Sequence, residues 1–372
     1  MGYGRPAWAE IDLLAIKKNM EQIKTLIKPG VLFCPILKAD AYGHGAPAVA
    51  RIAEQLGADY VGVAVLDEAI TLRDSGVTLP ILVLGPTEPH LSSLIVGNRI
   101  TQTIFTKEQA DALSAAAKAI QFQAKVHIKI ETGMSRVGVA PDEAADFYAY
   151  VKKLPNLDVE GTFTHFASAD SLDKTSAQEQ FALFTQVTEA MEAKAGPIPI
   201  KHCANSAAIL DMPQTHLDMV RAGVIIYGLW PSSEVTHPIT LTPAMQLKAR
   251  ATMVKTVDAG TRVSYGGRFQ ATAPTTVATF PIGYADGFTR MLSGKTKIVI
   301  NGAKAPIVGS ICMDQCMADV TGIDKVQVGT EALIFGGKAM PVEDIADLLG
   351  TINYEVVCMV GKRIPRLYIN KE

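Results

Sequence analysis

The chain has 372 residues, of which 48% are hydrophobic and 19% charged, a composition that can bury a sizeable core and excludes global disorder. Its formal net charge of −2 favours a small-molecule partner over nucleic acid or an anionic membrane. No uncharged run approaches the ~18 residues of a membrane span, no secretory signal is recognisable, and the few scattered cysteines indicate reduced thiols and no metal site, so we expect a cytoplasmic protein.

Short β-rich runs alternate with amphipathic, helix-forming segments over the first two thirds of the chain. Such alternation is typical of a parallel sheet, and eight repeats over about 200 residues fit a (β/α)8 barrel. An open doubly wound sheet is the alternative, but no GxGxxG motif opens a helix after the first strand. The predicted strands are 31–37, 60–65, 81–85, 100–105, 124–130, 159–166, 200–204 and 217–223. The predicted helices are 46–57, 66–76, 107–120, 141–154 and 178–193.

The pattern of predicted strands and helices changes near residues 238–243. Beyond them, short β-rich runs are broken by Gly, Pro, Asn and Asp, with one short helix predicted from Pro341. We therefore place the barrel at 12–238 and a mostly β domain at 239–372. The opening strand, 1–11, lies outside the eightfold count and can pack with either domain, including the C-terminal one.

Lys38 ends the first predicted barrel strand, after the apolar run VLFCPIL and before the Gly-rich turn AYGHG. Because catalytic residues of barrels lie at the C-terminal ends of strands, we expect Lys38 in the mouth. Burial there favours the neutral amine, which can attack a carbonyl carbon. The alternative is an ordinary surface lysine at the start of a loop. The glycines of the turn, together with Tyr42 and His44, weaken that alternative.

The last two predicted barrel strands run into segments suited to holding an anion. The seventh is followed by ANSAAIL, in which Ser206 is expected to cap a helix, and the eighth by RAGVIIYG, in which Gly223 allows close backbone approach. Phosphate sites in barrels often form from these loops. A mouth lysine and a phosphate cradle together indicate a phosphorylated aldehyde such as pyridoxal 5'-phosphate (PLP).

The segment ILKADAYGHGA resembles the cofactor-lysine motif of the alanine racemases, a fold-type III family of PLP enzymes. The resemblance continues in order through nearly the whole chain. It implies a PLP-holding barrel, a β-rich second domain, and a head-to-tail homodimer with shared active sites. It also implies interconversion of L-alanine and D-alanine, which supplies D-alanine for peptidoglycan. The further matching motifs are IETGMSRVG, THFASAD, HCANSAA, RAGVIIYG, VSYGGRF, IGYADG, CMDQ and INYEVVC...RIPR.

The resemblance implies a catalytic set of four residues. Lys38 would bind the cofactor covalently and move the substrate proton on one face, whereas Tyr265 of the partner subunit would serve the other face, hydrogen-bonded by His165. Arg221 would face the pyridine nitrogen, and because an arginine stays protonated, that nitrogen stays unprotonated. The competing interpretations are core packing for Tyr265 and a surface ion pair for Arg221.

The resemblance also implies a binding set around the cofactor and the entrance. Lys129 is carbamylated in many members, and the alternative here is an unmodified lysine on a polar strand face. The outer entrance differs from many members, which carry an arginine near Ser310. The implied cofactor-binding residues are Lys38, Tyr42, Arg136, His165, Asn205, Ser206, Arg221, Gly223, Val224 and Tyr354, with His202 in support. The implied substrate-binding residues are Arg136 and Met313. The implied entrance residues are Tyr265, Tyr284, Asp314 and Tyr354.

Three alternative functions stay open beside the racemization of alanine. A racemase of wider range would also accept serine or lysine, although Tyr354 is bulky in the implied substrate space. A fold-type III decarboxylase of basic amino acids would need a reactive cysteine and acidic residues in other motifs. A non-catalytic PLP-binding barrel protein would lack the β-rich second domain in which Tyr265 is predicted. The sequence does not distinguish a biosynthetic from a catabolic racemase.

Overall fold

The computed structural model describes residues 5–371. They divide into two compact units. Residues 16–41 and 46–242 form one of them, the barrel unit. Residues 5–15, 42–45 and 243–371 form the other, the β-rich unit. Within the described residues, no helix is long and apolar enough to cross a membrane.

Eight parallel strands form the barrel unit, as predicted. Strands β3 to β8 make one continuous parallel sheet, and β2 pairs in parallel with β9. A parallel bridge between Ile36 and Gly62 connects β2 to β3, and the Arg221 amide donates to the Ala204 carbonyl (3.0 Å) between β8 and β9. These contacts close the ring and confirm the barrel. The strands are β2 (Leu32–Pro35), β3 (Val61–Val63), β4 (Ile81–Val83), β5 (Thr101–Ile104), β6 (Ala124–Lys129), β7 (Leu157–Phe163), β8 (Ile200–His202) and β9 (Met219–Ala222).

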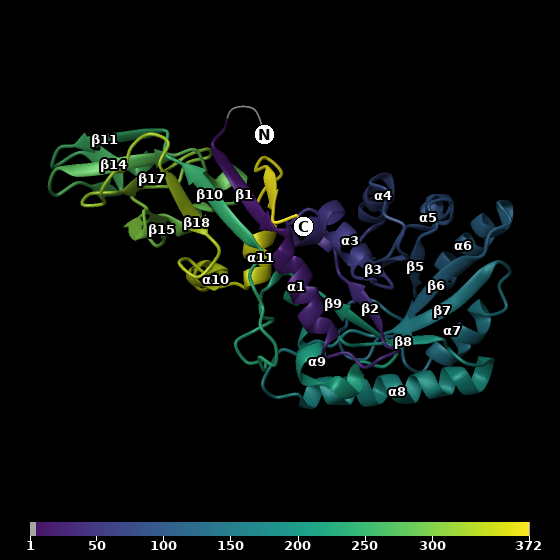
Figure 1. The fold of residues 1–372 in the computed structure, drawn as a ribbon. Helices are drawn as coiled ribbons and strands as arrows, with labels where there is room; N and C mark the ends of the chain where they lie inside the picture. The colour runs from purple at the N-terminus through teal and green to yellow at the C-terminus, as the bar shows by residue number, and fades with distance from the viewer. Residues whose placement is uncertain (1–4, 372) are drawn as a thin grey trace. The chain divides into compact units, whose positions relative to one another are not determined.

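Helices follow the strands and cover the outside of the barrel (Figure 1). All five predicted helices are present. The start of α6 illustrates how the sequence sets an end, because the Thr106 side chain accepts from the Gln109 amide while the Gln109 side chain accepts from the Thr106 amide. The helices are α1 (Leu13–Lys24), α3 (Ala46–Gln55), α4 (Leu66–Asp74), α5 (Ser92–Gly97), α6 (Lys107–Ala119), α7 (Ala144–Val151), α8 (Thr175–Ala195) and α9 (Ser206–Asp211).

The β-rich unit contains a six-stranded sheet in the order β16-β15-β18-β10-β1-β19 and a three-stranded sheet, β11-β14-β17. The opening strand β1 pairs antiparallel with β10 and parallel with β19. Val263, Val277 and Val308 form a buried cluster. The strands are β1 (Ala7–Asp12), β10 (Met245–Arg250), β11 (Met253–Val257), β12 (Arg262–Val263), β13 (Phe269–Gln270), β14 (Thr275–Phe280), β15 (Lys297–Ile300), β16 (Ala303–Pro306), β17 (Cys316–Asp319), β18 (Glu331–Phe335) and β19 (Arg366–Ile369).

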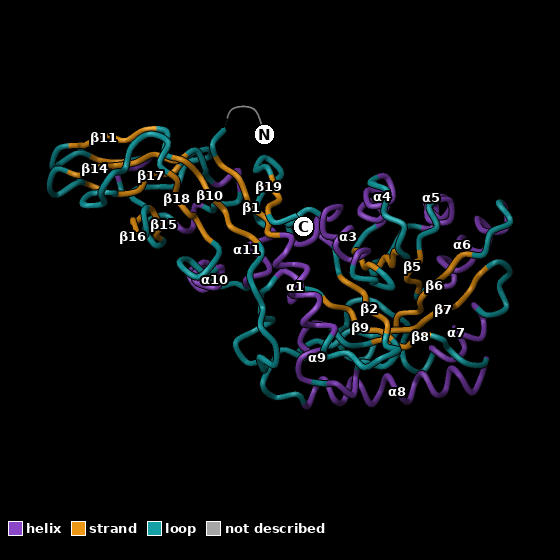
Figure 2. The backbone as a smooth tube through the Cα atoms, in the orientation of Figure 1, coloured by secondary structure: helices purple, strands orange, loops and turns teal. Residues whose placement is uncertain are grey.

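Two short helices complete the β-rich unit, α10 (Val342–Leu349) and α11 (Asn353–Cys358) (Figure 2). The helix predicted from Pro341 is α10, but Pro341 is its N-cap and the first helical residue is Val342. Pro341 adopts extended backbone (φ −56°, ψ 150°), so its fixed φ leads into the helix without being part of it.

Candidate active site

A left-handed turn follows β2 and begins at Lys38. Ala39, Asp40 and Ala41 have φ values of 53°, 53° and 54°, a conformation that costs non-glycine residues about 1–2 kcal/mol each. Two hydrogen bonds of the barrel unit hold it: the Ala46 amide donates to Asp40 Oδ1 (2.7 Å), and the Ala39 amide donates to the Glu68 carboxylate. Strand β2 itself ends three residues earlier, at Pro35, so a turn, not a strand end, carries Lys38. Strained backbone of this kind clusters at functional sites.

Positive charges converge on His165, which follows β7. Burial holds the pKa of His165 well below its usual range, and nearby Arg221, Arg136, Lys38 and Lys129 lower that pKa further. These cations come from chain segments at β2, β6 and β9. The barrel thus brings five residues of the predicted site into one electrostatic environment, which favours an anionic ligand.

Arg221, on β9, is buried, with 3% of its surface exposed. Its guanidinium donates to the carbonyls of Thr164 (2.8 Å) and Cys203 (3.1 Å) and contacts His202 Nδ1 (2.7 Å). Burial lowers the pKa of Arg221 to about 10, which leaves it protonated at neutral pH. No carboxylate among the described residues forms an ion pair with it, so the surface ion pair considered for Arg221 is excluded within residues 5–371.

Lys129, the last residue of β6, is buried at 2% exposure. Its Nζ donates to the Ile130 carbonyl (2.6 Å) and lies 5.8 Å from the centroid of the Phe163 ring. Burial is the main cause that lowers the pKa of Lys129 to about 8, with Arg221 and Arg136 acting in the same direction. About a tenth of the amine is therefore neutral at pH 7, and the neutral amine is the form that reacts with carbon dioxide.

The loops after β8 and β9, predicted to hold an anion, contact each other, and one prediction about them is wrong. The cap of α9 is Asn205, whose side chain accepts from the Ala208 amide (3.1 Å), and not Ser206. Ser206 is instead buried at the first helical position, where its hydroxyl accepts from the Gly223 amide (2.9 Å). A 3-10 helix begins at Val224, directly after Gly223. Ser206 therefore ties the two loops together.

Two predicted cofactor tyrosines lie together in the β-rich unit. The ring centroids of Tyr42 and Tyr354 are 6.0 Å apart, with the ring planes inclined at 54°. Burial raises the pKa of Tyr42, so its phenol is a neutral hydrogen-bond donor over the physiological range. Tyr354 lies on α11 and is half-buried.

The predicted second base, Tyr265, and the predicted residues Met313 and Tyr284 are exposed in the β-rich unit. Tyr265 is 69% exposed, Met313 52% and Tyr284 40%, so the core-packing interpretation of Tyr265 does not hold in the single chain. The Tyr284 amide donates to the Cys312 carbonyl (3.0 Å), which joins two of the loops that carry these residues. A Cβ at Gly283 would meet that carbonyl at 2.2 Å, so only glycine permits the close approach.

Three further contacts hold these loops. Ser310 Oγ donates to the Tyr265 carbonyl (3.1 Å), and Ser264 Oγ donates to the Ser310 carbonyl (2.6 Å). Asp314 forms an ion pair with Arg363. The position where the sequence departs from many members thus supports the backbone that presents the Tyr265 phenol.

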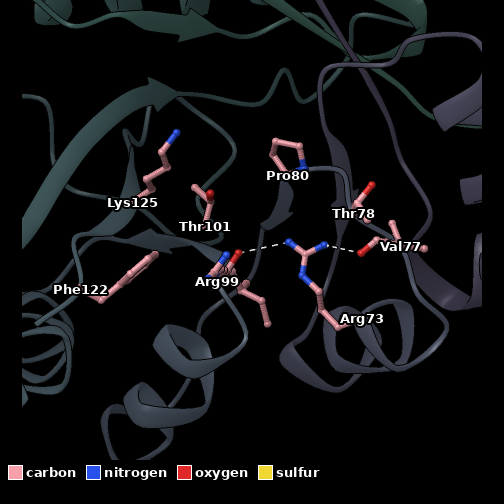
Figure 3. A pocket seen from close by; sticks show the side chains of 9 residues that line it. Arg73, Val77, Thr78, Pro80, Arg99, Thr101, Phe122 and Lys125 are labelled. Atoms are coloured by element: carbon pink, nitrogen blue, oxygen red, sulfur yellow. Dashed lines mark hydrogen bonds between the residues drawn. The ribbon is translucent and has the colours of Figure 1, made fainter. Parts of the chain in front are cut away.

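A separate pocket of about 430 Å³ opens near the amino ends of β4, β5 and β6 (Figure 3). The Arg73 guanidinium in it donates to the carbonyls of Val77, Leu79, Asn98 and Arg99. No predicted site residue lines it, and barrel active sites lie at the opposite, carboxyl ends of the strands. Its lining is Arg73, Val77, Thr78, Pro80, Arg99, Ile100, Thr101, Phe122 and Lys125.

Comparisons with known proteins agree over both units. The family model for the alanine racemase N-terminal domain matches residues 11–231, and that for the C-terminal domain matches residues 244–368. An alanine racemase of Desulfovibrio desulfuricans is 57% identical over 369 residues, which cover 99% of this chain and 100% of the relative. One of Methanococcus maripaludis is 46% identical over 371 residues, covering 98% and 99%.

Solved structures give the same result. An alanine racemase of Clostridium difficile 630 has a TM-score of 0.97 at 42% identity, covering 100% of this chain and 98% of that one. The alanine racemase of Bacillus anthracis with bound L-Ala-P has a TM-score of 0.94 at 34% identity, covering 100% and 97%.

Proposed function

The chain belongs to the alanine racemase family of isomerases, and we propose that it interconverts L-alanine and D-alanine with PLP by a two-base mechanism. The observation that carries the proposal is the convergence of Lys38, Arg136, Lys129 and Arg221 on His165. A mouth so rich in cations suits a ligand with a phosphate and a carboxylate.

The donor set fits PLP at each of its polar ends. Ser206, Gly223 and Val224 lie where two short helices begin, so the Ser206 hydroxyl and the Val224 amide suit a phosphate, beside Gly223. Tyr42 and Tyr354 are the further phosphate donors that the family resemblance implies. Lys38 would hold the aldehyde carbon. Arg221, already oriented by two carbonyls and His202, would face the ring nitrogen. When bound, PLP supplies the electron sink that makes the α-proton of an amino acid removable.

The two bases of the proposal come from different units of the chain. Lys38 Nζ would hold or release the proton on one face of the substrate, and the Tyr265 hydroxyl would do so on the other. Because Tyr265 is 69% exposed on a loop of the β-rich unit, we propose that it acts in the site of a partner subunit within a head-to-tail homodimer. His165 would orient it, while Arg136 and the partner's Met313 would meet the substrate carboxylate.

Lys129 and the entrance residues refine this proposal. The low pKa of Lys129 and its proximity to two arginines support carbamylation, because a carbamate replaces a buried cation by an anion that pairs with Arg136. Tyr284, Asp314 and Tyr354 would line the entrance, and the bulk of Tyr354 would favour alanine over serine and lysine. We further propose a cytoplasmic enzyme that provides D-alanine for peptidoglycan.

The test is racemization by the purified protein. L-alanine, L-serine and L-lysine are incubated separately with protein loaded with PLP, and the enantiomers are separated chirally. We expect D-alanine as the main product and loss of activity when PLP is removed. Absence of any D-amino acid from the loaded protein would overturn the proposal, and equal rates with all three substrates would overturn its specificity. A bacterial strain that requires D-alanine and grows without it when it expresses this chain would support the biosynthetic role.

A further inference from the structure

A chain of buried polar side chains leads away from Arg221 through the interior of the barrel. Arg221 contacts His202 Nδ1 at 2.7 Å, and His202 Nε2 lies 2.8 Å from His127 Nδ1. His127 Nε2 in turn lies 3.5 Å from a carboxylate oxygen of Glu160. His127 and His202 are both fully buried, at 0% exposure. The four residues stand on the adjacent strands β6, β7, β8 and β9 (Figure 1).

The chemistry of arginine gives this chain one direction. A guanidinium only donates, so His202 Nδ1 must accept and His202 must carry its proton on Nε2. That proton then points at His127 Nδ1, which must accept, so His127 also carries its proton on Nε2. Burial lowers the pKa of both histidines, which keeps them neutral and consistent with this single arrangement. The last N–H group of this series of contacts, on His127 Nε2, lies beside Glu160.

Glu160 is the anionic end of this series of contacts, Arg221–His202–His127–Glu160, which we call the relay. Its carboxylate accepts hydrogen bonds from the Tyr60 hydroxyl and the Lys125 ammonium. These donors and His127 hold the pKa of Glu160 at about 2 despite partial burial, so it is ionised at all physiological pH values. His127 Nε2 has no hydrogen-bond partner among the described residues, and its 3.5 Å separation from the Glu160 carboxylate is a polar contact longer than a hydrogen bond. Lys125 also lines the pocket at the amino end of the barrel (Figure 3).

A register shift between β6 and β7 places Glu160 beside His127. The register between β6 and β7 shifts between Val126 and His127, since Val126 pairs with Val159 whereas His127 pairs with Gly161. Glu160 is therefore the extra residue of a β-bulge, a feature that re-aims side chains and is frequent near active sites. A Cβ at Gly161 would lie 2.6 Å from the His127 ring, so glycine leaves the room that the ring occupies. On the other side, Phe163 stacks on His202, with centroids 4.8 Å apart and planes at 11°.

We propose that Glu160 is a positioning residue that acts through His127 and His202 on Arg221: from the other end of this series of contacts, its carboxylate stabilises the same Nε2–H tautomers that the contact with Arg221 requires. With the tautomers fixed, a lone pair of His202 always faces Arg221 and holds its guanidinium in one orientation. The proposal rests on the proposed function, because the role of Arg221 opposite the cofactor ring nitrogen gives its orientation a consequence.

The first test reads the tautomers without cofactor or substrate. The chain has seven histidines, so ¹⁵N-histidine labelling gives few side-chain signals, which single His→Gln variants assign. In PLP-free protein we expect His127 and His202 to show the Nε2–H pattern. Glu160→Gln removes the negative charge beside His127 Nε2, so the Nε2–H share of His127 should fall; unchanged tautomers at both histidines in this variant would overturn the role of Glu160. An Nδ1–H pattern at His202 in the unsubstituted protein would overturn the relay, and it does so even if Glu160→Gln fails to fold.

The second test separates positioning from structural support. With PLP bound, Glu160→Gln and His127→Gln should lower kcat about 10-fold, as outer-shell partners of histidine ligands do, with little change in KM. Loss of Arg221 alignment should also raise the fraction of turnovers that end in transamination. Lys125→Gln and Tyr60→Phe are matched controls, because each removes a partner of Glu160 but leaves its contact with His127. They should keep kcat and product distribution.

The outcomes are distinguishable. Altered tautomers with an unchanged kcat and unchanged transamination in an active enzyme would overturn the positioning role. Equal losses in the controls and in Glu160→Gln would overturn it too, since they would reflect packing. If the unsubstituted protein racemizes no amino acid, the proposed function and the positioning role fail together, whereas the tautomer measurement still reports whether the relay exists.

Discussion

The barrel unit and the β-rich unit contribute to the proposed active site in opposite ways. In the barrel unit, Arg221 is 3% exposed, Lys129 2% and His202 0%, and each is held by hydrogen bonds or ring contacts from neighbouring strands. In the β-rich unit, Tyr265 is 69% exposed and Met313 52%. The barrel-unit residues are held within one chain, whereas those of the β-rich unit are exposed, which supports our proposal that a partner subunit completes the site. Substitutions in the two units should therefore have different effects on activity and on stability.

Lys38→Ala should have the largest effect. It removes both the proposed attachment point of PLP and one of the two bases, so racemization should fall in both directions by more than the ~10²–10⁴-fold of a single acid–base group. Chiral separation of the products measures the loss. Lys28→Ala, at an exposed lysine, is the control and should be fully active. Reduction of the loaded protein with borohydride, followed by peptide mass spectrometry, should place the adduct on Lys38; an adduct on another lysine would refute the assignment.

Tyr265→Phe should have a smaller and asymmetric effect. Exchange of the L-alanine α-proton with solvent deuterium should fall by ~10²–10⁴-fold, while exchange of the D-alanine α-proton by Lys38 survives at a reduced rate. Because the side chain is exposed, the stability of the fold should not change. NMR detection of deuterium in each enantiomer measures both rates. Equal loss of the two exchanges would argue against two separate bases.

Complementation tests whether the site is shared. Mixed dimers of Tyr265→Phe and Lys38→Ala should recover activity, because one of their two sites keeps both bases. Dimers made from either variant alone are the controls and should stay inactive. Mixed dimers that are verified by mass but inactive would place both bases in one chain.

The sequence predicts the barrel better than it predicts the details of the site. Alternating runs identify the strands, since parallel strands buried on both faces are continuously apolar. It does not reveal that Ala39 and its neighbours are left-handed, because alanine seldom adopts that conformation and only tertiary hydrogen bonds enforce it. Glu160 was also missed: a strand carries charged residues for many reasons, and the bulge that turns this one toward His127 depends on the pairing of β6 with β7. The alternation of Lys125, His127 and Lys129 on one face of β6 was the available signal.

The pH dependence of stability should distinguish the buried site residues of the barrel unit from the exposed ones of the β-rich unit. The pKa of Lys129 is about 8 in the folded state and about 10.5 when unfolded, so between these values the unfolded state binds the extra proton. Lys129 alone should therefore raise stability with pH across this window, by about 3 kcal/mol in total. The buried thiols of Cys34, Cys203 and Cys316, whose pKa values burial raises, act in the opposite direction, so the contribution of Lys129 is the difference between the unsubstituted protein and Lys129→Met. Urea unfolding in buffers free of carbon dioxide measures the trend.

Two variants isolate the contribution of Lys129. Lys129→Met should lack this contribution, so its stability should change less favourably with rising pH than that of the unsubstituted protein. The Ile130 carbonyl still accepts from Thr164 Oγ1 (3.0 Å) in that variant. Tyr265→Phe, in the exposed half, should keep the slope of the unsubstituted protein. Bicarbonate added near pH 8 should stabilise the unsubstituted protein but not Lys129→Met if the amine is carbamylated. Identical slopes in all three proteins would contradict the lowered pKa.

Ala39→Gly should have the smallest effect and tests whether the turn that carries Lys38 stores strain. Removing Cβ relieves about 1–2 kcal/mol of left-handed strain, and the freer unfolded chain costs about 0.5–1 kcal/mol, so the net change in unfolding free energy should lie near zero or be slightly stabilising. Ala39 is exposed, and the hydrogen bond from its backbone amide to the Glu68 carboxylate is retained, so no packing is lost. The control is Ala115→Gly, at an exposed position within α6, which should lose about 1 kcal/mol. Denaturant unfolding of both variants measures the difference. Equal destabilisation by the two substitutions would mean that the turn is unstrained, and the buried half would then owe its geometry to its side-chain contacts alone.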